Sequence, residues 1–253
     1  MTTFPGATSR ANLSICLAAI GQFAAGLGPA EEAIRIAEAV DDAYSIASVY
    51  TALGRLYLER GDYDRAVPLL ERSVHVCRVT PVPIQLRPSA AHLGYAYAML
   101  GRVEEGLSLL EEARMQRASS YGQSLGEAWL GEVHLRCGLE TEAEEAGGRA
   151  LALSRQHQER DQAAWALRLL GEVAAHANPP DAEQAEGRYR EALALAEELE
   201  MRPLVAHCHL GLGMLYQKVG RDAEAQAELA TAAKMYRAME MTSWLAKAEA
   251  VLA

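Results

Sequence analysis

The sequence predicts an all-α protein, a right-handed α-solenoid of six helix-turn-helix repeats followed by a C-terminal capping helix. Half of its 253 residues are hydrophobic and only two are Phe, and Ala, Leu and Glu dominate, which is a helix-forming mixture. The stronger observation is a skeleton of small and large residues that recurs about every forty residues. An array of repeats needs no single large core, because each repeat contacts only its neighbours.

The clearest copy of this skeleton is the stretch LGRLYLERGDYDRAVPLLERS, from Leu53 to Ser73. Leu-Gly is followed by an aromatic residue three positions after the Gly, by a second Gly after seven positions and by a small residue after twelve. Further apolar positions are expected at sixteen and nineteen. The key positions of this copy are Gly54, Tyr57, Gly61, Ala66, Leu70 and Ser73. The pattern resembles the tetratricopeptide repeat, in which small residues let two helices touch.

The first Gly of the skeleton marks each copy, and we expect six markers, at Gly21, Gly54, Gly94, Gly131, Gly171 and Gly213. The second Gly should end the first helix with a positive φ, at Gly28, Gly61, Gly101, Gly138 and Gly220. The fifth copy has Asn178-Pro179-Pro180-Asp181 there, and Asp181 can cap the next helix. The small residue is expected at Ala33, Ala66, Gly106, Ala143, Ala185 and Ala225.

These copies predict a single array over residues 10–253, with repeats at 10–40, 42–79, 84–117, 120–157, 160–199 and 202–240. Residues 1–9 are expected to be a flexible tail and residues 242–252 a capping helix. No polar helix precedes Leu13, Leu17 and Ile20 in this scheme. We therefore expect the chain to be part of something longer and its uncapped N-terminal end to be a candidate surface for association.

Charge and composition argue against several classes of partner. The net charge is −10 with three lysines, whereas binding to a phosphate backbone needs clustered cations, so no nucleic acid is expected. No stretch approaches the length of a membrane span. Arg10 and the apolar run after it fit the repeat better than a secretion signal. The four scattered cysteines lack a C-x-x-C motif, which favours reduced thiols and a cytoplasmic location.

Motifs for catalysis, cofactors and metals are weak. Gly122-Gln123-Ser124-Leu125-Gly126 matches G-x-S-x-G, but that nucleophile motif needs a preceding strand, so Gly122 and Ser124 are interpreted as a turn and a cap. Gly211-Leu212-Gly213 lacks the third Gly of a dinucleotide site. No G-K-[ST] motif is present. His207 and His209 point apart on a helix. We expect no enzyme, no cofactor and no metal.

The remaining candidate site is the concave groove, which first-helix residues near each marker should line. The expected groove residues are Arg55, Tyr95, Trp129, Glu132, Arg136, Arg168, Glu172, His176 and Met214. Arg136 and Arg168 are expected to be exposed anchors, and Trp129 has an alternative interpretation as packing between hairpins. With only two Asn in the chain, a groove that clamps peptide backbones is disfavoured, and the carboxylate clamp of chaperone-tail-binding repeats is missing.

The C-terminal third carries a closer resemblance, over residues 164–253, in WALRLLGEVAAH, the NPP loop and MRPLVAHCHLGLG. It resembles the tetratricopeptide tail of bacterial signalling proteins in which a cyclase domain and a STAND or AAA-like ATPase precede the repeats. The chain has neither cyclase nor ATPase residues, so only a scaffold or sensor role is implied. We expect a non-catalytic module that binds a protein or peptide, as a fragment of or partner to such a protein. The alternative is a ligand or peptide sensor that regulates an attached effector domain.

Overall fold

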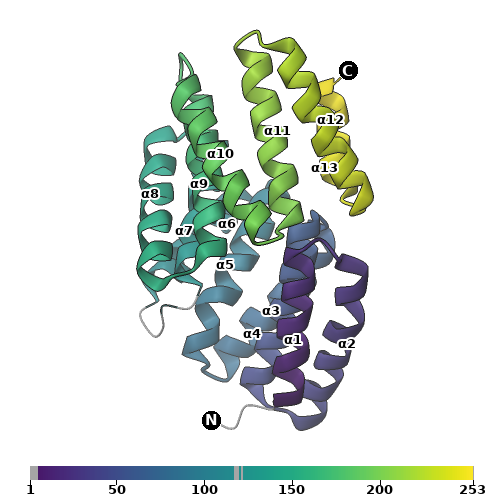
Figure 1. The fold of residues 1–253 in the computed structure, drawn as a ribbon. Coiled ribbons are helices and arrows are strands. Elements are labelled where there is room, and N and C mark those ends of the chain that lie inside the picture. Colours follow the sequence, from purple (N-terminus) through teal and green to yellow (C-terminus); the bar gives the residue numbers. More distant parts are fainter. Residues whose placement is uncertain (1–4, 117–119, 121, 253) are drawn as a thin grey trace. The chain divides into compact units, whose positions relative to one another are not determined.

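The computed structural model describes residues 5–116, 120 and 122–252. These residues form thirteen helices and no strand, which confirms the all-α prediction, and consecutive helices pack as hairpins (Figure 1). The chain divides into two compact units, Met1–Trp129 and Leu130–Ala253. The boundary falls within helix α7 (Gln123–Arg136).

The first unit contains six helices and the first half of α7. Their bounds are α1 (Pro5–Ala19), α2 (Phe23–Val40), α3 (Ala43–Arg60), α4 (Tyr63–Val79), α5 (Pro83–Met99) and α6 (Val103–Met115). The second unit contains the rest of α7 and the helices α8 (Glu140–His157), α9 (Arg160–His176), α10 (Ala182–Glu198), α11 (Arg202–Lys218), α12 (Asp222–Ala238) and α13 (Thr242–Leu252). The last of these coincides with the predicted capping helix.

Glycine turns end most of the first helices, as the skeleton predicts. Gly61 follows α3 with φ 91°, and its N–H donates to the carbonyls of Tyr57 and Leu58. Gly101, Gly138 and Gly220 also have positive φ. In the fifth hairpin, a side-chain oxygen of Asp181 accepts a bond of 3.0 Å from the backbone N–H of Gln184, which confirms the predicted cap of α10.

The small residues hold the two helices of a hairpin close together. In the third hairpin, a Cβ built on Gly106 would lie 2.6 Å from the carbonyl oxygen of Gly94, and one built on Gly94 would lie 2.7 Å from that of Gly106. A backbone carbonyl cannot rotate away as a side chain can. Both positions of this hairpin therefore require glycine.

The first repeat was assigned the wrong register. Its turn lies at Gly21, with φ 77°, whereas Gly28 lies inside α2, so Gly21 plays the part of the second Gly. The true marker position is Ser14, and the small residue is Gly26, both of them buried. The predicted tail was wrong for residues 5–9, which are helical because the first helix begins at Pro5. Residues 1–4 lie outside the described part of the chain.

Four links between hairpins use a non-glycine residue at positive φ. Asp41, Gln158, Glu200 and Glu240 follow α2, α8, α10 and α12 with φ between 55° and 59°. The N–H of Gln158, for example, donates to the carbonyls of Ser154 and Arg155. The left-handed conformation closes a helix through such bonds, and here four polar side chains adopt it where glycine is usual.

Candidate protein-binding face

The first helices carry all nine residues expected to line the groove, and in each unit we call the surface of its first helices the first-helix face. In the first unit these residues are Arg55 on α3, Tyr95 on α5 and Trp129 on α7. The ring of Tyr95 stacks on that of Trp129 with centroids 4.9 Å apart, and His92 meets the same indole edge-on at 4.6 Å. Tyr95 and Trp129 are only 7% and 6% exposed. Trp129 is therefore packed between hairpins, as its alternative interpretation proposes.

Arg55 and His92 are two polar residues near this aromatic stack. Arg55 donates to Glu59, one turn later on α3, at 2.6 Å. His92 is buried and donates from Nδ1 to the carbonyl oxygen of Pro88. Burial, with the nearby Arg55 guanidinium, lowers the pKa of His92 to about 3. His92 is therefore neutral at pH 7 and serves as an aromatic surface for Trp129.

The second unit brings three predicted residues together in an ion cluster. Arg168 on α9 donates both to Glu132 on α7 and to Glu172, one turn later on α9. The side chains of Arg168 and Glu132 are 10% and 12% exposed. The structure corrects the expectation that Arg168 is an exposed anchor, because its guanidinium is enclosed by two carboxylates. Separate bonds from its two terminal nitrogens to two carboxylates hold this buried arginine in one geometry.

Lys247 on α13 adds a second cation near this cluster. Burial raises the pKa of Glu172, but the charges of Arg168 and Lys247 more than offset this, so the pKa of Glu172 lies below its usual value. Conversely, burial lowers the pKa of Lys247 against the pull of Glu172. The ammonium of Lys247 also lies 5.3 Å from the ring centroid of Trp244 on the same helix.

An aromatic cluster next to these charges joins four helices. His207 on α11 lies between Trp165, Tyr236 and Trp244, with ring centroids at 5.6, 5.5 and 4.3 Å. Its Nδ1 is 2.7 Å from the hydroxyl oxygen of Tyr236. Burial holds the pKa of His207 well below its usual range, and the nearby cations Arg168 and Lys247 lower it further. His207 is thus a neutral core residue that anchors the capping helix.

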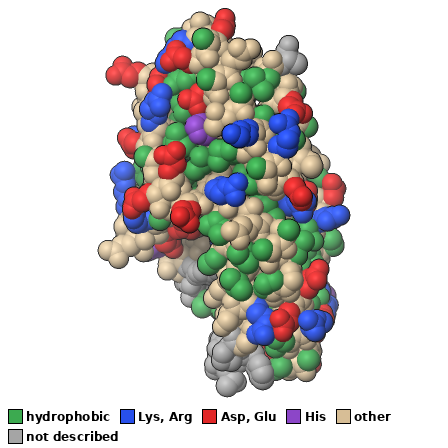
Figure 2. Space-filling model, turned by 45° about the vertical axis from the view of Figure 1, so that its right-hand side comes forward, with side chains coloured by type: hydrophobic (Ala, Val, Ile, Leu, Met, Phe, Trp, Pro, Cys, Tyr) green, Lys and Arg blue, Asp and Glu red, His purple; other side chains and the backbone are tan. Residues whose placement is uncertain are grey.

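The other predicted residues of this unit remain accessible. Arg136, His176 and Met214 are exposed, and the ring of His176 bonds to the carbonyl oxygen of Glu172 at 2.8 Å. Figure 2 shows cationic, acidic and hydrophobic side chains interspersed on the visible face, without a broad field of one sign.

A buried hydroxyl cluster of the first unit was not foreseen. Thr51, Ser73 and Ser89, from α3, α4 and α5, lie 2.8 to 3.0 Å from one another. Ser73 also donates to the carbonyl oxygen of Ala47, and Ser89 to that of Gln85. The skeleton expects an apolar side chain at Ser73. The only signal in the sequence is the polar character of these three residues at core positions.

Two structural features bear on metals and membranes. Within residues 5–116, 120 and 122–252, no three His, Cys, Asp or Glu side chains lie close enough to hold a metal ion. In the same part of the chain, no helix has the length and apolar character needed to cross a lipid bilayer. The four cysteines are unpaired thiols.

Comparison with known proteins begins at the N-terminal repeats. Residues 6–78 match the family model "Tetratricopeptide repeat". No curated protein sequence matches the chain significantly. Solved structures extend the likeness to the whole chain, since a Rap protein complexed with Competence and Sporulation Factor covers all of it with a TM-score of 0.69. The chain has the tetratricopeptide repeat fold.

The similar structures are distant in sequence and therefore show the fold alone. The Rap protein is 15% identical, and 75% of it is covered. NprR in complex with its cognate peptide NprX is 11% identical, with a TM-score of 0.68 over 97% of this chain and 73% of NprR. A STAND protein from Pyrococcus horikoshii with a tetratricopeptide repeat sensor is 18% identical, with a TM-score of 0.53 over 96% of this chain. The match covers 38% of that longer protein.

Proposed function

We propose that this chain is a non-catalytic tetratricopeptide repeat module that binds a protein or peptide on its first-helix face. The observation that carries this proposal is the makeup of that face in the second unit. There, exposed Arg136 and His176 lie on α7 and α9, the helices that hold the fixed pair of Glu132 and Arg168, and exposed Met214 lies on α11. Arginine is one of the residue types that supply most of the binding energy at protein interfaces, which supports Arg136 as an anchor for a partner.

The proposal includes a place in signalling. The resemblance of residues 164–253 to the tails of signalling proteins supports a role as fragment of, or partner to, a bacterial signalling ATPase or cyclase, in the cytoplasm. The STAND protein with a repeat sensor supports the ATPase part of this idea through its fold only. This chain would supply the binding surface, and the enzymatic activity would belong to another domain or chain.

Selection from a displayed library of random peptides tests the binding role without a known partner. Peptides enriched on the full chain are expected to lose at least tenfold in affinity for the double variant Arg136→Glu/Met214→Lys, measured by fluorescence anisotropy. Both side chains are exposed, so the fold should change in stability by only about 0.5 kcal/mol per site.

The matched control lies on a second helix of the same unit. Glu142→Arg/Glu144→Arg changes two exposed residues of α8 and should leave peptide affinity within twofold. Equal loss in the two double variants would remove the first-helix face as the binding surface. Failure to enrich any peptide would contradict the binding role for peptides.

A peptide sensor is the second candidate, and the NprR complex with its cognate peptide favours it. A sensor differs from a scaffold because its ligand binds two conformations with different affinity. Hydrogen exchange of α7, the helix that both units share, would distinguish the two. A sensor should change the exchange rates of α7 by at least threefold on binding, whereas a scaffold should change them only at contact residues.

A further inference from the structure

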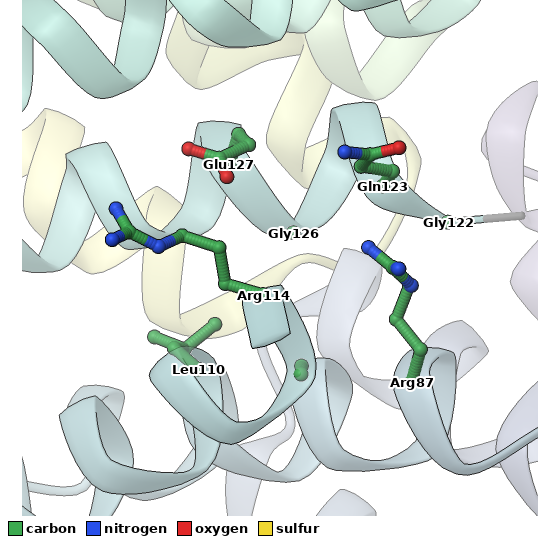
Figure 3. Close-up of a pocket in the computed structure, with 8 residues that line it drawn as sticks. Arg87, Leu110, Arg114, Gly122, Gln123, Gly126 and Glu127 are labelled. Atoms are coloured by element: carbon green, nitrogen blue, oxygen red, sulfur yellow. The ribbon is translucent and has the colours of Figure 1, made fainter. Parts of the chain in front are cut away.

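A small pocket in the first unit lies between α5, α6 and the start of α7 (Figure 3). Its enclosed part is about the size of one water molecule, and it opens to the surface. The G-x-S-x-G stretch at the start of α7 supplies three of the lining residues. The full lining is Arg87, Leu110, Ala113, Arg114, Gly122, Gln123, Gly126 and Glu127.

Arg87 is the unusual member of this pocket. It is 5% exposed, and in Figure 3 its side chain extends from α5 toward Gly122 and Gln123 at the start of α7. It forms no hydrogen bond or ion pair with any described residue, and its buried Nε has no partner. Burial lowers the pKa of Arg87, and the charge of nearby Glu127 opposes this. A guanidinium stays protonated even so, and burying it without hydrogen bonds is costly.

Packing does not require an arginine at this position. Arg87 lies seven residues before the marker Gly94, and the corresponding residues of the other repeats are small and buried, at Ala7, Ala47, Ser124, Ala164 and Ala206. A methyl or hydroxymethyl group therefore satisfies the hairpin. The contrast with Arg168, which is 8% exposed and held by two carboxylates, shows what Arg87 lacks.

The rest of the pocket favours a singly charged anion. Arg114 adds a second guanidinium from α6, which already pairs with Glu111 at 3.0 Å, and Gln123 offers amide donors at the N-terminus of α7. The positive end of a helix also attracts anions. Against these, Glu127 contributes one buried negative charge. The carboxylates of Glu111 and Glu127 lie beside these guanidinium groups and would repel a dianion such as phosphate more strongly than a singly charged anion.

We propose that this pocket binds a carboxylate from an acidic side chain of a peptide partner, with Arg87 as its central donor. One carboxylate oxygen is about the size of a water molecule, and it accepts a charge-assisted hydrogen bond from a guanidinium. It would give Arg87 a partner that no described residue of its own chain provides. This inference rests on the proposed function for the source of the carboxylate, but the site lies outside the residues predicted for the first-helix face.

Small anions test the pocket without any partner. We would melt the full chain in 0.1 M sodium acetate, sodium phosphate or sodium chloride at matched ionic strength and pH 7. Acetate is expected to raise the melting temperature by about 2–4 °C over chloride, as a ligand bound only by the folded state does. The shift should vanish in Arg87→Met and persist in Arg160→Met, whose exposed arginine pairs with Glu198 in the other unit.

A second variant keeps the test decisive if Arg87→Met fails to fold. Glu127→Gln leaves Arg87 in place and removes the repelling charge, so its acetate shift should be at least twice that of the parent. No acetate-specific shift, an unchanged shift in Arg87→Met, or a smaller shift in Glu127→Gln would overturn the proposal. A phosphate shift as large as that of acetate would also overturn it, as a general anion effect. None of these results depends on the peptide selection, so the two proposals fail separately.

Discussion

The two units build the same hairpin but satisfy its buried polar groups differently. Three residues before the marker glycine, the second hairpin has Thr51 and the fifth has Arg168, and both are buried. Thr51 joins a cluster of neutral hydroxyls, whereas Arg168 joins two carboxylates. The comparison shows that the repeat fixes where a side chain is buried but not its polarity, provided that the neighbouring hairpins supply partners.

Reversing the charge of Arg168 should have the largest effect. Arg168→Glu would place three carboxylates together in the second unit, and we expect a loss of about 3–5 kcal/mol in the free energy of unfolding, measured in urea. Arg160→Glu breaks an exposed pair with Glu198 and should cost only about 1 kcal/mol or less. If the two variants lose equally, the second unit does not depend on its ion cluster as we describe.

Glycine substitutions compare packing in the two units. Gly106→Ala in the first unit should cost about 1–3 kcal/mol, because the new Cβ would lie 2.6 Å from a backbone oxygen. Gly148→Ala in the second unit meets no atom within 4 Å on an exposed helix position and should gain about 0.5–1 kcal/mol. Calorimetric melts of both variants give the signs directly, and a neutral Gly106→Ala would contradict the close approach of α5 and α6.

Each unit also contains a buried neutral histidine, and the pH dependence of the free energy of unfolding should show the contribution of both. An unfolded histidine takes up a proton near pH 6.5 while folded His92 and His207 do not, so stability is complete above that pH and falls below it. We expect about 1.4 kcal/mol per pH unit for each histidine between about pH 6 and pH 5. Below about pH 4.5, Glu172 adds to the loss, since its folded pKa is lowered.

His92→Phe separates the two contributions. The phenyl ring can keep the contact with Trp129, and the bond that it loses, from Nδ1 to the carbonyl oxygen of Pro88, joins a neutral imidazole and so lowers stability equally from pH 7 to pH 5. Unfolding followed from pH 7 to pH 5 should therefore show about half the slope of the parent. A slope that stays unchanged would mean that His92 is not a source of the acid sensitivity.

The hydroxyl cluster should give the smallest effect. Ser89→Ala removes bonds to Thr51 and Ser73 and should cost about 1 kcal/mol. The double variant Ser73→Ala/Ser89→Ala should cost less than the sum of the two single variants, because they share a bond. Strict additivity in a double-mutant cycle would show that the hydroxyls act independently.

Local signals in the sequence were sufficient for most of the fold. The turns at Gly61 and Gly220, the cap at Asp181 and the last helix follow from conformational preferences of the residues themselves. The register assigned to the first repeat was wrong because Gly21 and Gly28 have the seven-residue spacing of the two skeleton glycines. Spacing alone could not tell which glycine has the positive φ.

The candidate face was harder to predict, because its character depends on pairs between hairpins. Arg168 and Glu172 are one turn apart, so the sequence shows that they are neighbours. It does not show that Glu132, from the preceding hairpin, closes on Arg168 and buries it. For the same reason, the sequence does not show that Arg87 is buried without an ion pair to a described residue. Both arginines look like surface residues until the partners from other helices are known.

The corrected register of the first repeat bears on how the gene could have grown. With its marker at Ser14, forty residues before Gly54, the first hairpin has the same spacing as the second and fourth. Duplication or loss of one block of about forty codons would then add or remove one complete hairpin. Because each hairpin contacts only its neighbours, the remaining hairpins would still pack against the same kind of surface. Such a duplication would not always copy both members of a polar pair, because Arg168 pairs with Glu132 of the preceding hairpin. A duplicated hairpin would therefore contain a buried arginine without the carboxylate that pairs with it in the original hairpin. Arg87 is also a buried arginine that forms no ion pair with a described residue. A ligand carboxylate can supply the missing partner at such a position.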